Sequence, residues 1–142
     1  MTRIDFYSNA EPKLQCACQL TAKALQRSLR VVIYVVDEDT ARNMDKMLST
    51  FQAAGFIPHC PANHALASET PVVIAREDSE MPHYQLLLNL HSESPALFSR
   101  FDRLIELVGA DDDDRRLARD RYRFYRDRGY EIHHHDLAKA GT

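Results

Sequence analysis

The stretch RVVIYVV, residues 30–36, decides the fold that we expect for this chain. Its β-branched residues favour an extended strand, and the apolar run after Arg30 has no alternation that would leave one face in water. Strands with both faces covered are typical of parallel sheets, because the connecting helices pack on each side. The sequence therefore predicts an α/β fold around a mostly parallel sheet.

Three further segments predict strands of the same sheet. RIDFY at residues 3–7 alternates polar and apolar side chains, PVVIA at residues 71–75 is a second β-branched run, and YQLLLNL at residues 84–90 is rich in leucine. After Gly129, the segment YEIHHHDL predicts either a last short strand or an extended tail. By contrast, GFIPHCP at residues 55–61 predicts a turn-rich connection.

Helical periodicity predicts helices between these strands. Pro12 suits the start of the first helix, whose buried side consists of small and apolar residues. Asp37 or Asp39 would cap the second helix. The inner stripe of that helix consists of Ala41, Met44, Leu48 and Phe51.

A third helix is expected behind Ser94 and Pro95, which resemble an N-cap followed by a first-turn proline. Gly109 would end it in the left-handed conformation. Because strands and helices alternate without repeats or linkers, the chain predicts one three-layer α/β domain at residues 1–142. The buried side of the third helix would contain Leu97, Phe98, Phe101, Leu104, Ile105 and Val108.

The composition excludes several classes of protein. The chain has 142 residues, 44% of them apolar and 27% charged, and its net charge of -3 argues against a protein that coats DNA by charge. No stretch approaches the roughly 18 apolar residues of a membrane-spanning helix, and the first residues lack the apolar run of a signal peptide. We therefore expect a cytoplasmic protein with reduced thiols at Cys16, Cys18 and Cys60.

Motifs of nucleotide binding and catalysis are missing from the sequence. None of the four glycines follows the first strand, so YSNAEPK contains neither a dinucleotide-binding fingerprint nor a phosphate-binding loop. No catalytic triad or carboxylate pair stands out, and we expect no catalytic residue and no cofactor. His133 and His135 would share one face of a strand and suit a metal ion, but no third ligand is evident. A solvated end strand or tail is therefore the favoured interpretation, without a metal.

The segment RRLARDRYRFYR, residues 115–126, is the most distinctive part of the chain. With about 100° of rotation per residue, a helix gathers five of its arginines within about one third of the circumference and places Tyr122 at their border. Arg121 falls inside the opposite, apolar arc, where an unpaired charge would be costly. We therefore expect Arg121 to reach a carboxylate or carbonyl groups as a structural arginine. The five arginines of the outer face are Arg115, Arg116, Arg119, Arg123 and Arg126.

Two interpretations of this basic face are open from the residues alone. The first is a solvated helix surface, in which the aspartates at residues 111–114 satisfy the positive end of the helix dipole. The second is an anion site, because a guanidinium can hold a carboxylate through two parallel hydrogen bonds and Tyr122 could wall an apolar pocket beside it. An acidic peptide ending in an aromatic residue would fit, and so would phosphate or single-stranded nucleic acid.

The sequence resembles the chi subunit of bacterial DNA polymerase III over nearly its whole length. LARDRYRFYR is the most specific piece, and FY in the first strand, FIPH after the second helix and HALASETPVVI behind it agree with it. The resemblance implies a nucleotide-binding-like, Rossmann-like topology without catalytic activity. Chi-like proteins are accessory subunits of the clamp-loader assembly of the replicative polymerase.

The resemblance also implies two partners. One is the psi subunit, which ties chi-like proteins to the clamp loader. The other is the acidic C-terminal tail of single-stranded-DNA-binding protein, which ends in proline and phenylalanine with a free carboxylate. The implied function is an adaptor in DNA replication, with no direct DNA contact and no membrane contact.

Site residues follow from the matching motif. Arg119 would hold the terminal carboxylate of the tail, and Tyr122 and Val108 would line the pocket for the terminal phenylalanine. Arg115, where the family can carry lysine, and Arg123 would attract the aspartates of the tail.

Phe56 would belong to the patch that meets psi, and a plain core position is its alternative. The chain departs from the family at Ser49, where a tryptophan is frequent, and at Ser68, where a glycine is frequent. Both departures bear on the psi side. Two rival functions stay open: a direct single-stranded nucleic-acid-binding module that uses the same arginines, and an enzyme or nucleotide-binding protein on the α/β scaffold.

Overall fold

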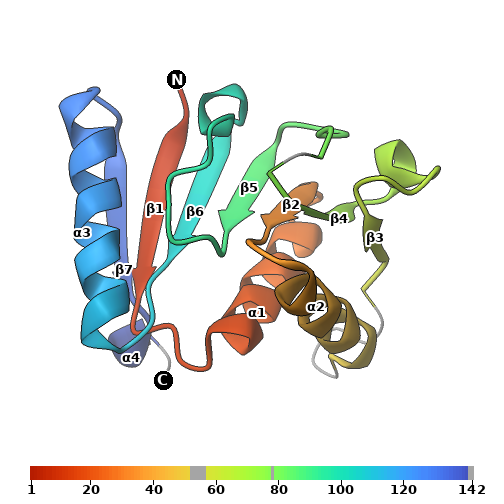
Figure 1. Ribbon diagram of the computed structural model, residues 1–142, viewed down its shortest axis with the longest axis horizontal. Helices are drawn as coiled ribbons and strands as arrows, with labels where there is room; N and C mark the ends of the chain where they lie inside the picture. Colours follow the sequence, from red (N-terminus) through yellow and green to blue (C-terminus); the bar gives the residue numbers. More distant parts are fainter. Residues whose placement is uncertain (52–56, 78, 141–142) are drawn as a thin grey trace.

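A computed structural model describes residues 1–51, 57–77 and 79–140, apart from the side chains of Lys139 and Ala140 (Figure 1). Within these residues, seven parallel strands form one sheet in the order β3-β4-β2-β5-β6-β1-β7. The all-parallel sheet confirms the prediction of an α/β fold. The strands are β1 (Arg3–Ser8), β2 (Val31–Tyr34), β3 (His59–Pro61), β4 (Val72–Ala75), β5 (Leu86–Asn89), β6 (Arg103–Leu107) and β7 (Ile132–Asp136).

Helices cover both faces of the sheet, which gives the three layers that the sequence predicts. α1 (Lys13–Gln26) and α2 (Glu38–Thr50) pack on one face and form the α1–α2 core with it. α3 (Asp112–Asp127) packs on the other face and forms the α3 core. Figure 1 shows α3 beside β7, away from α1 and α2. The short elements are η1 (Ala67–Glu69), η2 (Phe98–Arg100) and α4 (Leu137–Ala140).

The central strand β2 explains why residues 30–36 determine this architecture. Val31 and Ile33 face the α1–α2 core, whereas Val32 and Tyr34 face the α3 core, and all four are buried. Successive side chains of a strand point to opposite faces, so a strand covered on both sides must be apolar throughout.

The prediction of a helix behind Ser94 and Pro95 is wrong. This part of the chain forms η2 and then β6, and Gly109 does not adopt the left-handed conformation. The helix-like spacing arises because Phe98 of η2, Leu104 of β6 and Phe101 between them all reach the α3 core. Residues 104–108 are all buried, as expected for a strand that is covered on both faces. Leu104 and Val108 contact the α3 core, whereas Ile105 and Leu107 contact the α1–α2 core.

The predicted N-cap of α2 is confirmed, and the other local features of the chain can be compared with it. The side chain of Asp37 caps α2 by accepting a hydrogen bond from the Thr40 N–H at 2.7 Å. Gly129 follows α3 with a φ of 81°, the left-handed conformation that favours glycine after a helix. Residues 132–136 form a strand rather than a tail. The expected connection at residues 55–61 instead ends in the short edge strand β3.

His83 is a buried histidine without a well-formed hydrogen bond to any described residue. His83 is only 7% exposed. Burial, together with the positive charge of Arg30, lowers the pKa of His83 from 6.5 to about 4. Between these two values the unfolded chain binds a proton that the folded protein does not bind. The free energy of unfolding must therefore fall as the pH drops through this window.

We predict that His83→Leu makes the fold less sensitive to acid. The parent should lose up to roughly 3 kcal/mol of stability through this group between neutral pH and pH 4, and the variant should not. Urea unfolding at pH 7 and pH 4.5 measures the difference. His134→Gln, a change at an exposed histidine, serves as the control. Identical pH dependence of parent and His83→Leu would contradict the prediction.

Candidate functional site

Helix α3 contains the arginine-rich residues 115–126, and we call it the arginine helix. It begins at a topological switch point of the sheet. β1 and β6 are neighbours, but β1 connects through α1 on one face while β6 connects through α3 on the other. In open α/β sheets, ligands bind outside the carboxyl ends of the strands at such points. Two of the residues expected at the site lie here: Val108 follows β6, and the Arg115 guanidinium donates to the Asn9 Oδ1 at 3.2 Å.

Carboxylates occupy the backbone N–H groups that a phosphate would need at this switch point. Asp111 caps α3 by accepting from the Asp114 N–H at 2.8 Å, and Asp114 accepts from the Gly109 N–H. Glu11 accepts from the Ala110 N–H at 3.4 Å. A nucleotide phosphate would have to displace these negative groups, which agrees with the missing glycine-rich loop.

The electrostatics of Asp114 support its role as a fixed anion. Burial acts to raise the pKa of Asp114, but the hydrogen bond from Gly109 and the charge of Lys13, 3.1 Å away, outweigh burial and hold that pKa below its ordinary value. Asp114 therefore stays ionised at neutral pH and joins α3 to the start of α1.

A buried polar network connects α3 to the sheet. Glu106, on β6, is fully buried and accepts hydrogen bonds from Arg121 Nε at 3.0 Å, Asn89 Nδ2 at 2.9 Å and the Tyr125 hydroxyl. The second branch of Arg121 donates to the Ser92 carbonyl at 2.7 Å. The prediction that Arg121 reaches a carboxylate and carbonyl groups as a structural arginine is confirmed.

Burial and pairing oppose each other in this network. Burial raises the pKa of the Glu106 carboxyl, and the hydrogen bonds and the charge of Arg121 counteract part of that effect. Burial, with the adjacent Glu106, also raises the pKa of Tyr125, so that its hydroxyl remains a donor. With Arg121 and Tyr125 directed inward, the remaining arginines of α3 point to solvent.

Those outer arginines differ in how they are paired. Arg116 pairs with Asp113 at 2.8 Å, Arg123 with Asp120, and Arg126 with Asp127 at 3.0 Å. Arg115 lies 4.0 Å from Asp112 and also bonds Asn9. Among the described residues, only Arg119 of this face has no hydrogen-bond or ion-pair partner.

Tyr122 lies beside these arginines, as the helical wheel predicts. Its half-buried ring packs edge-on against Phe6 with centroids 6.0 Å apart, and the Arg126 guanidinium lies 5.8 Å from its centre. Val108 is 6% exposed within the α3 core, so it can offer only an edge to a ligand. The ring of His134, a residue not predicted to lie at this site, is tilted against the Tyr122 ring, with the two ring centroids 5.3 Å apart. Phe56 lies outside the described residues.

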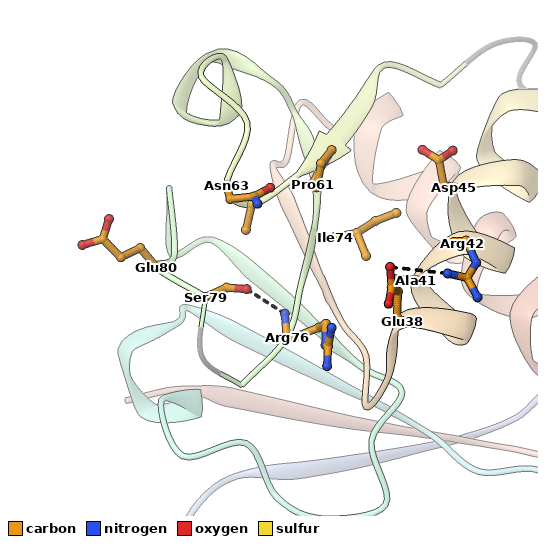
Figure 2. Close-up of a pocket in the computed structure, with 11 residues that line it drawn as sticks. Glu38, Ala41, Arg42, Asp45, Pro61, Asn63, Ile74, Arg76, Ser79 and Glu80 are labelled. Carbon is orange, nitrogen blue, oxygen red and sulfur yellow. Dashed lines mark hydrogen bonds and ion pairs between the residues drawn. The ribbon is translucent and has the colours of Figure 1, made fainter.

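A surface cavity lies elsewhere, between α2 and the carboxyl ends of β3 and β4 (Figure 2). Its volume is about 960 Å³, and Ala41 and Ile74 contribute apolar surface. Arg42 on its rim is engaged by Glu38 at 3.4 Å. A second cavity of about 490 Å³ is lined by residues around Tyr34 and His91. Neither cavity is lined by a residue of the arginine helix.

Two histidines of the run are engaged by carboxylates of neighbouring residues. His133 bonds Glu131 and His135 bonds Asp5 at 2.9 Å, and the described residues contain no group of three metal-ligating side chains. Asp5 also forms ion pairs with Arg3 at 3.2 Å and with Arg103 at 3.0 Å. Burial acts to raise the pKa of Asp5, but these partners outweigh it and lower that pKa.

In the part of the chain that the structure describes, no helix is long and apolar enough to cross a membrane.

Fold and site together define a Rossmann-like α/β protein whose switch point is occupied by carboxylates and an arginine helix. Solved structures agree on the fold. The C-terminal domain of the DEAD-box protein Dbp5 superimposes with a TM-score of 0.65 at 11% identity, covering 97% of this chain and 91% of that one. The structure of S. cerevisiae Dbp5 bound to RNA and ADP BeF3 superimposes with a TM-score of 0.67 at 11% identity, covering 99% of this chain and 43% of that one. At this identity the likeness extends to the fold alone.

Sequence comparison identifies the family. The profile of "DNA polymerase III chi subunit, HolC" matches residues 1–133, and the chain belongs to this family. DNA polymerase III subunit chi of Pseudomonas aeruginosa is 37% identical, covering 98% of this chain and 99% of the relative. Subunit chi of Escherichia coli is 28% identical, covering 92% and 88%. The protein is thus an accessory subunit of the replicative polymerase and not itself its catalytic component.

We predict that removing one partner of the buried Glu106–Arg121 pair destabilises the fold strongly. Arg121→Met leaves a buried carboxylate without its cation and should cost about 3–5 kcal/mol in urea unfolding. Adding Glu106→Gln removes the buried charge, so the double variant should be more stable than Arg121→Met alone. Arg116→Met, which breaks an exposed pair, should change stability by less than about 1 kcal/mol. Strictly additive losses in the double variant would contradict this prediction.

Proposed function

We propose that this chi-family protein links DNA-bound single-stranded-DNA-binding protein to the replication machinery in the cytoplasm, by holding the acidic C-terminal tail of that protein on α3. The observation that carries the proposal is Arg119. It is the exposed guanidinium of the arginine face that no described residue engages, and it lies one helical turn from the half-buried Tyr122.

The unpaired guanidinium of Arg119 supports the proposed capture of a carboxylate. A guanidinium presents two parallel N–H donors to a carboxylate, and this charge-assisted pair is stronger than a bond between neutral groups. Because Arg119 is not occupied by an aspartate of its own helix, binding requires no internal ion pair to break. A C-terminal carboxylate is the ligand that matches one such unpaired cation.

The ring of the terminal phenylalanine would lie against Tyr122, with the exposed edge of Val108 completing an apolar seat. Arg115 and Arg123 would attract the aspartates that precede it. Both are now held by exposed pairs on the helix surface, and such pairs contribute little, so exchange for the aspartates of the tail is cheap. The rim charges would speed encounter and make binding sensitive to salt.

Direct binding of single-stranded nucleic acid is the weaker alternative. α3 contains six arginines but also five aspartates, which leaves a net charge of only +1 along the helix. A phosphate backbone binds to a row of uncompensated cations. Competition by oligonucleotides that strengthens with their length would favour this alternative over the peptide.

We further propose that psi is the second partner and ties the protein to the clamp loader, with Phe56 in the contact patch. Family membership supports this proposal. When this chain and a psi subunit from the same organism are produced together, they should elute from a sizing column as one heterodimer. Separate elution of the two chains would contradict the psi assignment and leave tail binding untouched.

We predict that Arg119→Ala weakens binding of a tail peptide about 10- to 100-fold, the loss expected for a hydrogen-bonded charge pair. Fluorescence anisotropy with a labelled peptide measures the affinity, and circular dichroism checks the fold. Arg128→Ala is the matched control, because Arg128 packs 3.6 Å over the Phe124 ring on the far side of the helix. Equal affinities of Arg119→Ala and the parent would refute the assignment.

A further inference from the structure

His134 occupies a different position from the other two histidines of β7. In the parallel pairing of β7 with β1, His134 is in register with Phe6, and its exposed ring stacks on that ring at 5.8 Å with an angle of 27°. The same imidazole lies 5.3 Å from the Tyr122 ring. His134 therefore belongs to the face that carries α3.

Side-chain alternation separates the three histidines. His133 and His135 point to the opposite face, where Glu131 and Asp5 engage them. His134 has no hydrogen bond to a described residue and faces two aromatic rings. Its ring is thus open to a ligand, while those of its neighbours are already engaged.

Charged groups of both signs lie near His134, and each is already engaged: Arg126 pairs with Asp127 at 3.0 Å. From α3, Tyr122 contacts it, with the Arg126 guanidinium over the same tyrosine ring. From β1, the contact is Phe6. The nearest acidic residue on its own strand face is Asp136, which accepts a hydrogen bond from Asn9 at 2.8 Å.

We propose that His134 is a further ligand-contacting residue of the tail site, forming an aromatic wall with Tyr122 and, when protonated, adding a positive charge for the acidic peptide. This inference rests on the proposed tail binding by α3. It places the peptide in the angle between α3 and the outer strand β7 rather than on the helix alone.

A histidine contact has a signature that the arginines lack. Histidine changes charge between pH 5 and 8, whereas arginine stays charged throughout. Tail affinity should therefore increase as the pH falls. An exposed charge pair contributes up to about 1 kcal/mol, so Kd should fall about threefold to fivefold between pH 8.0 and pH 6.0.

The test is a titration with an N-terminally acetylated peptide ending Asp-Ile-Pro-Phe, at both pH values and constant ionic strength. Acetylation removes the one peptide group that titrates in this range. His134→Phe keeps a ring but should bring the ratio of the two Kd values close to one. His134→Ala also loses the ring contact, and its affinity should fall about twofold to tenfold even at pH 8.0. His133→Ala, on the other face, should retain the ratio of the parent.

Two outcomes would overturn the inference while leaving tail binding intact. One is a parent that binds the peptide with a pH ratio unchanged in His134→Phe. The other is a His134→Ala variant with the affinity of the parent at both pH values. Failure of the parent to bind the peptide at all would instead refute the proposed function, and this inference with it.

Discussion

A carboxylate buried in the sheet, Glu106, is the constraint on which the arrangement of the arginine helix depends. A buried anion is strongly unfavourable without a cation and hydrogen-bond donors. Arg121 and Tyr125 of α3 supply both, together with Asn89 of β5. Because those two α3 side chains must point inward, the rotation of α3 about its axis is fixed. The other arginines of α3 consequently face outward. The buried network around Glu106 thus determines which side of α3 is exposed to solvent.

The aspartates of the chain then shape that surface. Asp111 and Asp114 accept hydrogen bonds from backbone N–H groups at the start of α3, so a phosphate at the switch point would have to displace them. Further along the helix, aspartates pair with the arginines beside them and leave Arg119 open. A protein of net charge -3 can in this way hold one selective cationic position without a generally basic face.

Much of this arrangement could be predicted from the sequence, because helical and strand periodicity are local properties. Helical periodicity predicts that Arg121 is buried and Arg119 exposed. The apolar run of residues 30–36 predicts a mostly parallel sheet. The strand β6 was missed, because apolar residues from η2 and β6 happen to repeat at helical spacing. The contacts of His134 with Phe6 and Tyr122 were not predicted, because they depend on the neighbours of β7 in the sheet, which local patterns do not reveal, although strand alternation already separated it from His133 and His135.

Capture of a free C-terminal carboxylate by Arg119 is the central claim, and one comparison tests it most directly. Isothermal titration of the protein with a peptide ending Asp-Ile-Pro-Phe would be run once with a free C-terminus and once with the terminus amidated, which removes the negative charge and replaces one acceptor oxygen with an NH2 donor. We expect the free acid to bind and amidation to weaken binding at least about tenfold. Equal affinity for the two peptides would contradict carboxylate capture and leave the role of the arginine face open to another anion.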